Sequence, residues 1–108
     1  MKPTLLLGYD IGTSSIKASV VDATTGATVA SAQYPDTEAA IITPHPGWAE
    51  QDPRQWWDSL LAATQRLGRQ LASTSASLAD VSAIGISYQM HGLVCVDKAG
   101  EPLRNAII

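Results

Sequence analysis

GYDIGTSSIKASVVD, residues 8–22, contains the octet DIGTSSIK, residues 10–17, which places a carboxylate, a glycine, three hydroxyls and a lysine directly after an apolar run. The sequence predicts a strand over residues 4–9 and a second over 15–22. A third is predicted over residues 27–35, which are rich in small and β-branched side chains. ATTG, residues 23–26, offers a turn glycine between the second and third strands and so predicts a hairpin. Three strands with tight connections predict an antiparallel meander.

A long helix is expected after a proline-containing connection at residues 36–51, which carries at most a short extended piece at 40–43. Asp52 is a good N-cap, and Pro53 suits the first helical position. Apolar residues then recur at steps of three and four to about Leu71, which predicts one amphipathic helix.

The last third begins after a polar linker. VSAIGIS, residues 81–87, is continuously apolar and follows a helix, so it predicts a buried strand parallel to its neighbour. GLVCVD, residues 92–97, predicts one more strand, with Cys95 as a buried, inert thiol. LRNAII, residues 103–108, begins a further element. The order is β-β-β-α-β-β, an α/β layout that matches the opening of the ribonuclease-H-like, actin-like ATPase fold.

Composition narrows the classes of protein. The 108 residues allow one domain at most, and a net charge of −3 with a pI near 5.1 argues against a nucleic-acid surface. No run approaches the length of a membrane span, and the three leucines near the start are too short for a signal-peptide core. One cysteine excludes an internal disulfide. We expect no membrane partner and a cytoplasmic location.

The segment after the first strand has two interpretations that its residues alone leave equally open. It can be a polar turn chosen for its turn chemistry. It can also be a phosphate loop, in which Asp10 holds Mg²⁺ and Gly12 lets phosphate oxygens approach main-chain N–H groups. The candidate phosphate ligands are Gly12, Thr13, Ser14, Ser15 and Lys17.

Other polar and aromatic residues have simple structural interpretations. His91 and His45 are most simply loop histidines, and Trp56 fits the apolar stripe of the helix. Glu50 is most simply a solvated residue before the helix. Trp48 is either a packing residue before the helix or a pocket wall, with neither favoured.

Three stretches of the chain, taken together, favour the phosphate-loop interpretation over the polar turn. GYDIGTSSIKASVVD resembles the first phosphate-binding hairpin of the superfamily of sugar kinases, heat-shock-protein-70 chaperones and actin. GWAEQDPRQWW, residues 47–57, resembles the equivalent stretch of the FGGY carbohydrate kinases, and QMHG, residues 89–92, resembles a segment of the xylulokinases in that family. They occur in family order and span nearly the whole chain. The chain resembles the N-terminal part, residues 1–108, of the first actin-like domain of such a kinase, with the rest of that domain and the second domain absent.

The resemblance implies transfer of the γ-phosphoryl group of ATP to D-xylulose, giving xylulose 5-phosphate, with ATP and Mg²⁺ as cofactors. It assigns Asp10 to the metal and the loop residues to the phosphates. It assigns Met90, His91 and Gln89 to the sugar, and reverses the structural interpretation of His91. The general-base aspartate is expected beyond Ile108, so no catalytic residue is assigned here and the fragment is expected to be inactive. For the full-length protein, a homodimer is one expectation.

One departure affects the expected substrate. Tyr88 stands where a glycine is common before QMHG, so another FGGY substrate such as ribulose, gluconate or glycerol is an alternative to xylulose. A non-catalytic, actin-like nucleotide-binding module is a second alternative. QMHG and the EQDP…WW stretch disfavour that module, because neither is needed to bind nucleotide.

Overall fold

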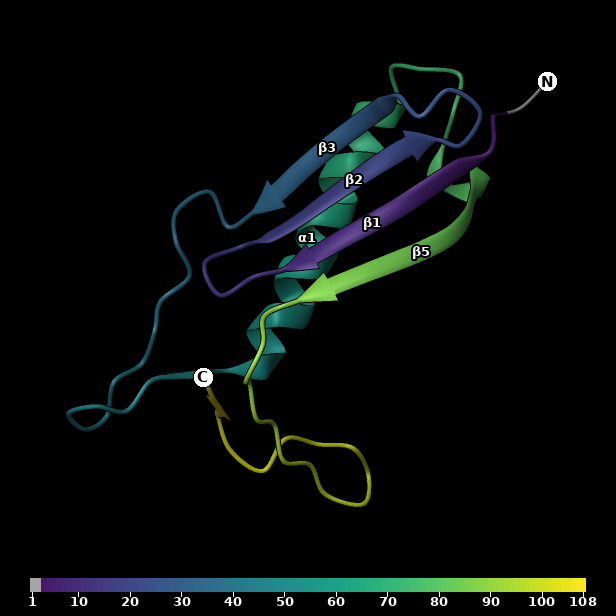
Figure 1. Ribbon diagram of the computed structural model, residues 1–108. Coiled ribbons are helices and arrows are strands. Elements are labelled where there is room, and N and C mark those ends of the chain that lie inside the picture. Colours follow the sequence, from purple (N-terminus) through teal and green to yellow (C-terminus); the bar gives the residue numbers. More distant parts are fainter. Residues whose placement is uncertain (1–2) are drawn as a thin grey trace.

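The computed structural model describes residues 3–108, which form a four-stranded sheet with one long helix on one of its faces (Figure 1). The strand order is β3-β2-β1-β5, and a second, two-stranded sheet pairs β4 with β6. The elements in chain order are β1 (Leu5–Ile11), β2 (Ile16–Asp22), β3 (Thr28–Tyr34), β4 (Glu50–Gln51), α1 (Pro53–Leu71), the 3-10 helix η1 (Leu78–Asp80), β5 (Val81–Tyr88) and β6 (Ala106–Ile107).

The first three strands form the predicted meander. β1 pairs with β2, and β2 with β3, both antiparallel, and the turn into β3 has Gly26 at a φ of 75°. β5 returns on the other side of β1 and runs parallel to it. The long connection through α1 allows this parallel pairing, because a crossover is needed to bring the chain back to the same end of the sheet.

The core lies between α1 and the sheet face that it covers. Alternate residues of β1 and β2 point to this face, as the two-residue period of a strand requires. The helix contributes residues spaced by four, which form one stripe. The principal buried apolar residues are Leu5, Leu7, Tyr9, Ile16, Ala18, Val20, Ala63, Leu67 and Leu71.

The start of α1 confirms the predicted cap. The Asp52 side chain accepts a hydrogen bond from the Arg54 N–H at 3.0 Å, and Pro53 occupies the first turn. The helix ends at Leu71, as the apolar period predicted. No helix in residues 3–108 is both long and apolar enough to cross a bilayer.

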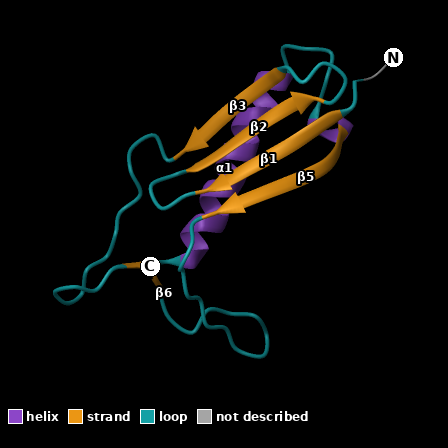
Figure 2. Cartoon of the chain, in the orientation of Figure 1, coloured by secondary structure: helices purple, strands orange, loops and turns teal. Residues whose placement is uncertain are grey.

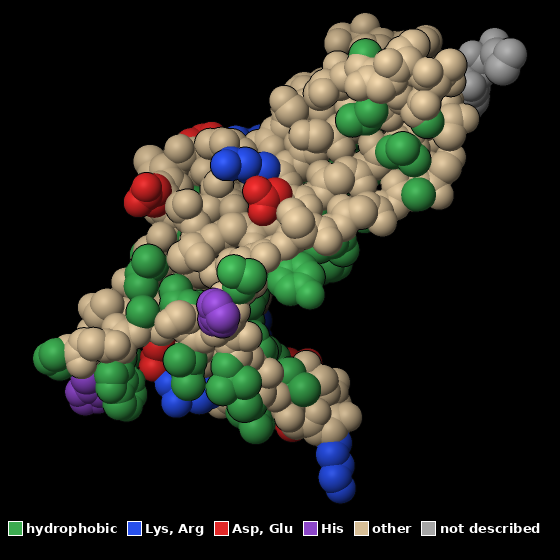
Figure 3. Space-filling model, in the orientation of Figure 1, with side chains coloured by type: hydrophobic (Ala, Val, Ile, Leu, Met, Phe, Trp, Pro, Cys, Tyr) green, Lys and Arg blue, Asp and Glu red, His purple; other side chains and the backbone are tan. Residues whose placement is uncertain are grey.

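The second face of the sheet is open. Figure 2 shows α1 behind the sheet, and Figure 3 looks onto the opposite surface, where hydrophobic side chains are visible. Ile84 and Ile86 of β5 are 59% and 58% exposed, so the prediction of a buried strand at 81–87 is wrong for this chain. The strand itself and its parallel direction are confirmed. β5 is exposed because it is an edge strand and α1 covers the sheet on one side only.

Residues 92–97 do not form the predicted strand. Only isolated bridges occur there, from Leu93 to Ile107 and from Val96 to Pro102, and the segment is otherwise a loop. Cys95 is exposed, so the prediction of a buried thiol is also wrong. The apolar run lacks a neighbouring strand to complete a sheet. The short β4–β6 ladder, which the sequence did not predict, closes the end of this loop.

Candidate phosphate and substrate site

The loop between β1 and β2 is a tight turn closed by its own backbone. The Gly12 N–H donates to the Ser15 carbonyl oxygen at 3.0 Å. A Cβ added at Gly12 would lie 3.0 Å from that same oxygen, a tight contact that a larger residue would have to push apart. The close approach of the two backbone segments therefore favours glycine at this position.

Asp10 lies near the carboxyl end of β1 with an exposed side chain. Its Oδ1 lies 3.5 Å from Ser87 Oγ of β5. Residues 3–108 contain no group of three or more His, Cys, Asp or Glu side chains able to hold a metal ion. A single accessible carboxylate suits Mg²⁺, which is commonly held by one or two carboxylates together with water and substrate phosphates. The donor chemistry at Asp10 therefore fits the predicted ion.

Some of the predicted phosphate ligands share a hollow. Ser14, Ser15 and Lys17 line a space of about 220 Å³, together with the start of the segment that follows β3. Asp36 and Glu38 also line it, so the hollow carries two carboxylates as well as the positive charge of Lys17. Gly12 and Thr13 do not line it.

Asp36 is held at the wall of this hollow by Arg66 of α1. The guanidinium makes two hydrogen bonds to the carboxylate, at 2.7 and 3.1 Å, and a third to the Gln33 carbonyl oxygen at 2.8 Å. The hydrogen bond and the charge of Arg66 lower the pKa of Asp36 below its ordinary value, and the same pair raises the pKa of Arg66. Asp36 therefore stays ionised near neutral pH, and its negative charge is paired with the positive charge of Arg66.

The QMHG segment forms a second pocket, of about 300 Å³. Gln89, Met90 and His91, the three predicted sugar ligands, all line it. Met90 is 77% exposed, and His91 adopts a φ of 66°, in the left-handed region. The remaining lining residues are Ile11, Trp56, Tyr88 and Gly92.

Two of these lining residues qualify the predictions. Trp56 was expected in the core, but it is half-buried, and its ring forms part of the pocket wall. Tyr88, the departure noted before QMHG, is 71% exposed on the same pocket. The pocket therefore presents two aromatic side chains beside the imidazole of His91, a composition suited to a small ligand with polar groups.

The two loops touch because β1 and β5 are parallel neighbours, so their carboxyl ends meet at one edge of the sheet (Figure 1). The Gln89 N–H donates to the Ile11 carbonyl oxygen at 2.9 Å. The Thr13 hydroxyl donates to Gln89 Oε1. Gln89 Nε2 is buried without a hydrogen-bond partner among the described residues. Edges of this kind are where α/β sheets place ligands.

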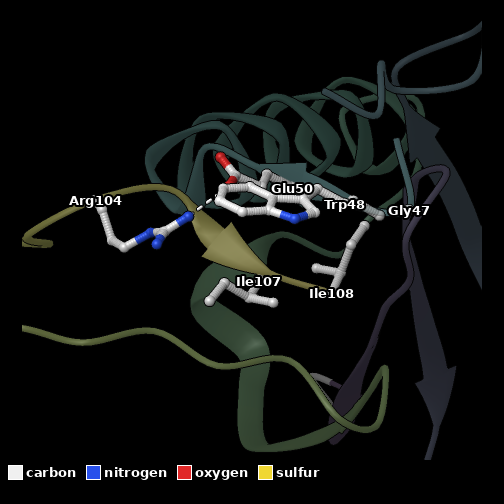
Figure 4. A pocket seen from close by; sticks show the side chains of 7 residues that line it. Gly47, Trp48, Glu50, Arg104, Ile107 and Ile108 are labelled. Atoms are coloured by element: carbon white, nitrogen blue, oxygen red, sulfur yellow. Dashed lines mark hydrogen bonds and ion pairs between the residues drawn. The ribbon is translucent and has the colours of Figure 1, made fainter. Parts of the chain in front are cut away.

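A third pocket, of about 360 Å³, lies where β4 meets β6 (Figure 4). Glu50 is 6% exposed there, so its prediction as a solvated residue is wrong. Its carboxylate forms an ion pair with Arg104 and accepts a hydrogen bond from Asn105 Nδ2 at 3.3 Å. Trp48 is 51% exposed on the wall, which favours the second of its two interpretations. The burial of Glu50 could not be predicted from its neighbours in the sequence, because its partners lie more than 50 residues away.

Similarity to known proteins identifies the family of the chain. The model of the "FGGY family of carbohydrate kinases, N-terminal domain" matches residues 5–108, and the chain belongs to this family. It is 41% identical over 104 residues to a xylulose kinase of Streptomyces coelicolor, covering 96% of this chain and 19% of the relative.

Other relatives differ in their named substrate. A glycerol kinase of Delftia acidovorans is 42% identical over 106 residues, covering 97% of this chain and 20% of the relative. The crystal structure of a xylulose kinase from Rhodospirillum rubrum superposes with a TM-score of 0.77 at 32% identity, covering 95% of this chain and 20% of that one. The fold is therefore that of these sugar kinases, and the chain spans about a fifth of the length of the relatives it matches.

Proposed function

We propose that the protein to which this chain belongs transfers the γ-phosphoryl group of ATP to a sugar hydroxyl, and that its sugar is D-xylulose. The observation that carries the proposal is the contact between two loops at one sheet edge. The glycine-containing turn after β1 offers hydroxyls and backbone N–H groups, and the QMHG loop after β5 offers a pocket for a small ligand. Phosphoryl transfer needs both partners held in line at close range.

On the phosphate side, the chain's own groups supply donors and charge. Ser14, Ser15 and Lys17 line the hollow beside the turn, and the Gly12 N–H closes that turn on the Ser15 carbonyl oxygen. Thr13 turns its hydroxyl toward Gln89 instead, so we assign it to the junction between the loops. Asp10 would hold Mg²⁺ directly or through water, and the ion supplies neutralisation of phosphate charge when bound.

On the sugar side, His91 is the principal polar group. Its imidazole can donate or accept a hydrogen bond to a sugar hydroxyl, and Met90 gives an apolar wall. The buried Gln89 Nε2, which lacks a partner among the described residues, adds an amide donor beside the same loop. We assign all three residues to substrate binding. The proton acceptor for the sugar hydroxyl is expected outside these 108 residues, so we expect the isolated chain to be catalytically silent.

A second candidate is phosphorylation of another small polyol or sugar. The observation that favours it is the 42% identity to a glycerol kinase, against 41% to a xylulose kinase. The bulky, exposed Tyr88 on the pocket wall is a concrete reason for a changed substrate. A pocket lined this way discriminates between sugars through individual hydroxyl contacts, which can be worth large factors in specificity.

The test is a substrate panel with the intact protein. ADP release is coupled to a spectrophotometric assay, with Mg-ATP and D-xylulose, D-ribulose, gluconate or glycerol as acceptors. We expect the highest kcat/KM for D-xylulose, with a sugar phosphate as product. A higher kcat/KM for another acceptor would assign the second candidate. Absence of turnover with every acceptor would favour a nucleotide-binding module. The same assay on the 108-residue chain is expected to give no turnover.

A further inference from the structure

Gln51 of β4 is a polar side chain buried beside the phosphate loop, with both ends of its amide occupied. It is 1% exposed. Its Nε2 donates to the Thr13 carbonyl oxygen at 2.7 Å and, at 3.4 Å, to that of Ala40. Its Oε1 accepts from the indole Nε1 of Trp56 at 3.0 Å. Because an indole N–H only donates and a carbonyl only accepts, these partners allow one orientation of the amide.

These bonds place Gln51 between the two loops of the candidate site. Thr13 belongs to the turn after β1, and its hydroxyl donates to Gln89. Trp56 lines the pocket that contains His91. Gln51 therefore bonds to the phosphate loop through one end of its amide and to a wall residue of the QMHG pocket through the other. Gln51 itself lines neither the hollow beside the phosphate loop nor the QMHG pocket.

The bond to the Thr13 carbonyl has a consequence for the loop backbone. In a trans peptide the N–H of the next residue points away from the carbonyl, in the same plane. Fixing the Thr13 carbonyl toward Gln51 therefore fixes the Ser14 N–H in the opposite direction, away from the protein interior that Gln51 occupies. Oriented backbone N–H groups are what makes a turn of this kind able to hold an anion.

We propose that Gln51 is a positioning residue, which orients the Thr13–Ser14 peptide group so that the phosphate loop keeps its binding geometry beside the sugar pocket. The inference rests on the proposed function, since it gives the loop a phosphate to bind. Gln51 itself touches no reactant. Its effect should appear in the binding of Mg-ATP and not in that of the sugar.

The test compares two glutamines in the intact protein. Gln51→Met keeps an unbranched side chain of similar length but removes the hydrogen bonds. Gln70→Met is the control, because Gln70 bonds the Ser31 backbone at 2.6 and 3.1 Å and joins α1 to β3 away from both loops. We expect Gln51→Met to raise the KM for Mg-ATP about fivefold or more, the size expected for one lost hydrogen bond, with the sugar KM within about twofold. The control should leave both KM values unchanged.

Two outcomes would overturn the role. Equal changes in the two KM values would make Gln51 a general structural residue, and unchanged values would leave it without influence on the loop. If the wild-type protein itself phosphorylates no sugar, that result counts against the proposed function and not against Gln51. A second measurement covers that outcome, and also a Gln51→Met variant that fails to fold.

That measurement is hydrogen exchange of the wild-type protein and of Trp56→Phe, which removes the N–H held by Gln51 Oε1. We expect the Gly12 amide, which donates to the Ser15 carbonyl oxygen, to exchange about fivefold faster in the variant, with the amides of 16–22 unchanged, because the Gln51 amide bonds to the turn and not to β2. Unchanged exchange at Gly12 would refute the positioning role whether or not the protein turns over a sugar.

Discussion

Replacing Gly12 with alanine tests whether the tight turn after β1 is the phosphate loop. The added Cβ would lie 3.0 Å from the Ser15 carbonyl oxygen, closer than an ordinary van der Waals contact. That oxygen accepts the hydrogen bond that closes the turn, so it cannot move without opening the loop. The φ of Gly12 lies outside the left-handed region, so the cost comes from this contact and not from backbone conformation.

Forcing an extra methyl into a packed site typically costs about 1–3 kcal/mol. If the turn relaxes by giving up its phosphate geometry, that energy corresponds to a rise of about 5- to 150-fold in the KM for Mg-ATP. The assay is steady-state ADP release by the intact protein, with ATP and sugar varied separately. We expect the sugar KM to stay within about threefold, because the QMHG loop belongs to another strand.

Gly68→Ala is the matched control. Gly68 lies inside α1, where a Cβ would meet Leu78 Cδ1 at 3.4 Å, an ordinary contact. The same substitution should there stabilise the protein by up to about 1 kcal/mol and leave both KM values unchanged. The reasoning fails if Gly12→Ala binds Mg-ATP as the wild type does, or if Gly68→Ala weakens ATP binding to the same degree.

Two further predictions concern the fold. In the 108-residue chain, Leu67→Ala should lower the free energy of unfolding by about 2–5 kcal/mol, because Leu67 is 0% exposed. Ile84→Ala should lower it by less than about 1 kcal/mol, because Ile84 is 59% exposed. Equal losses of the two variants in urea unfolding would contradict the core assignment. The folded-state pKa of Asp36 lies below its ordinary 3.8, so the stability from its pair with Arg66 is present above that pH and is lost as the pH falls through the lowered value. Asp36→Asn should therefore be less stable than wild type near neutral pH and equal to it in strong acid, and a deficit that persists in strong acid would refute this origin.

The parts of the fold that the sequence predicted well are those set by nearby residues. The hairpin depended on a turn glycine between two short strands, and Gly26 has the positive φ that such a turn uses. The helix start depended on Asp52 and Pro53, whose effects act within one turn. The three proposed sugar ligands were predicted from a motif four residues long, and the structure places these residues on one pocket.

The parts that were missed depend on distant partners. Glu50 is buried because Arg104, 54 residues later, neutralises it, and no local pattern announces such a pair. Cys95 lies in an apolar run that resembles a strand but has no neighbouring strand to complete a sheet. The proposed role of Gln51 could not be predicted for the same reason, since its partner Thr13 lies 38 residues away.

The most direct test of the central claim is a paired kinetic comparison in the intact protein, with Asp10→Asn beside His91→Ala. The claim is that the loop after β1 serves phosphate and metal, and the loop after β5 serves the sugar. We predict that Asp10→Asn lowers kcat and weakens the dependence on Mg²⁺ with little change in the sugar KM. His91→Ala should raise the sugar KM and leave ATP affinity nearly unchanged. The reverse pattern, or the same pattern in both variants, would contradict the account.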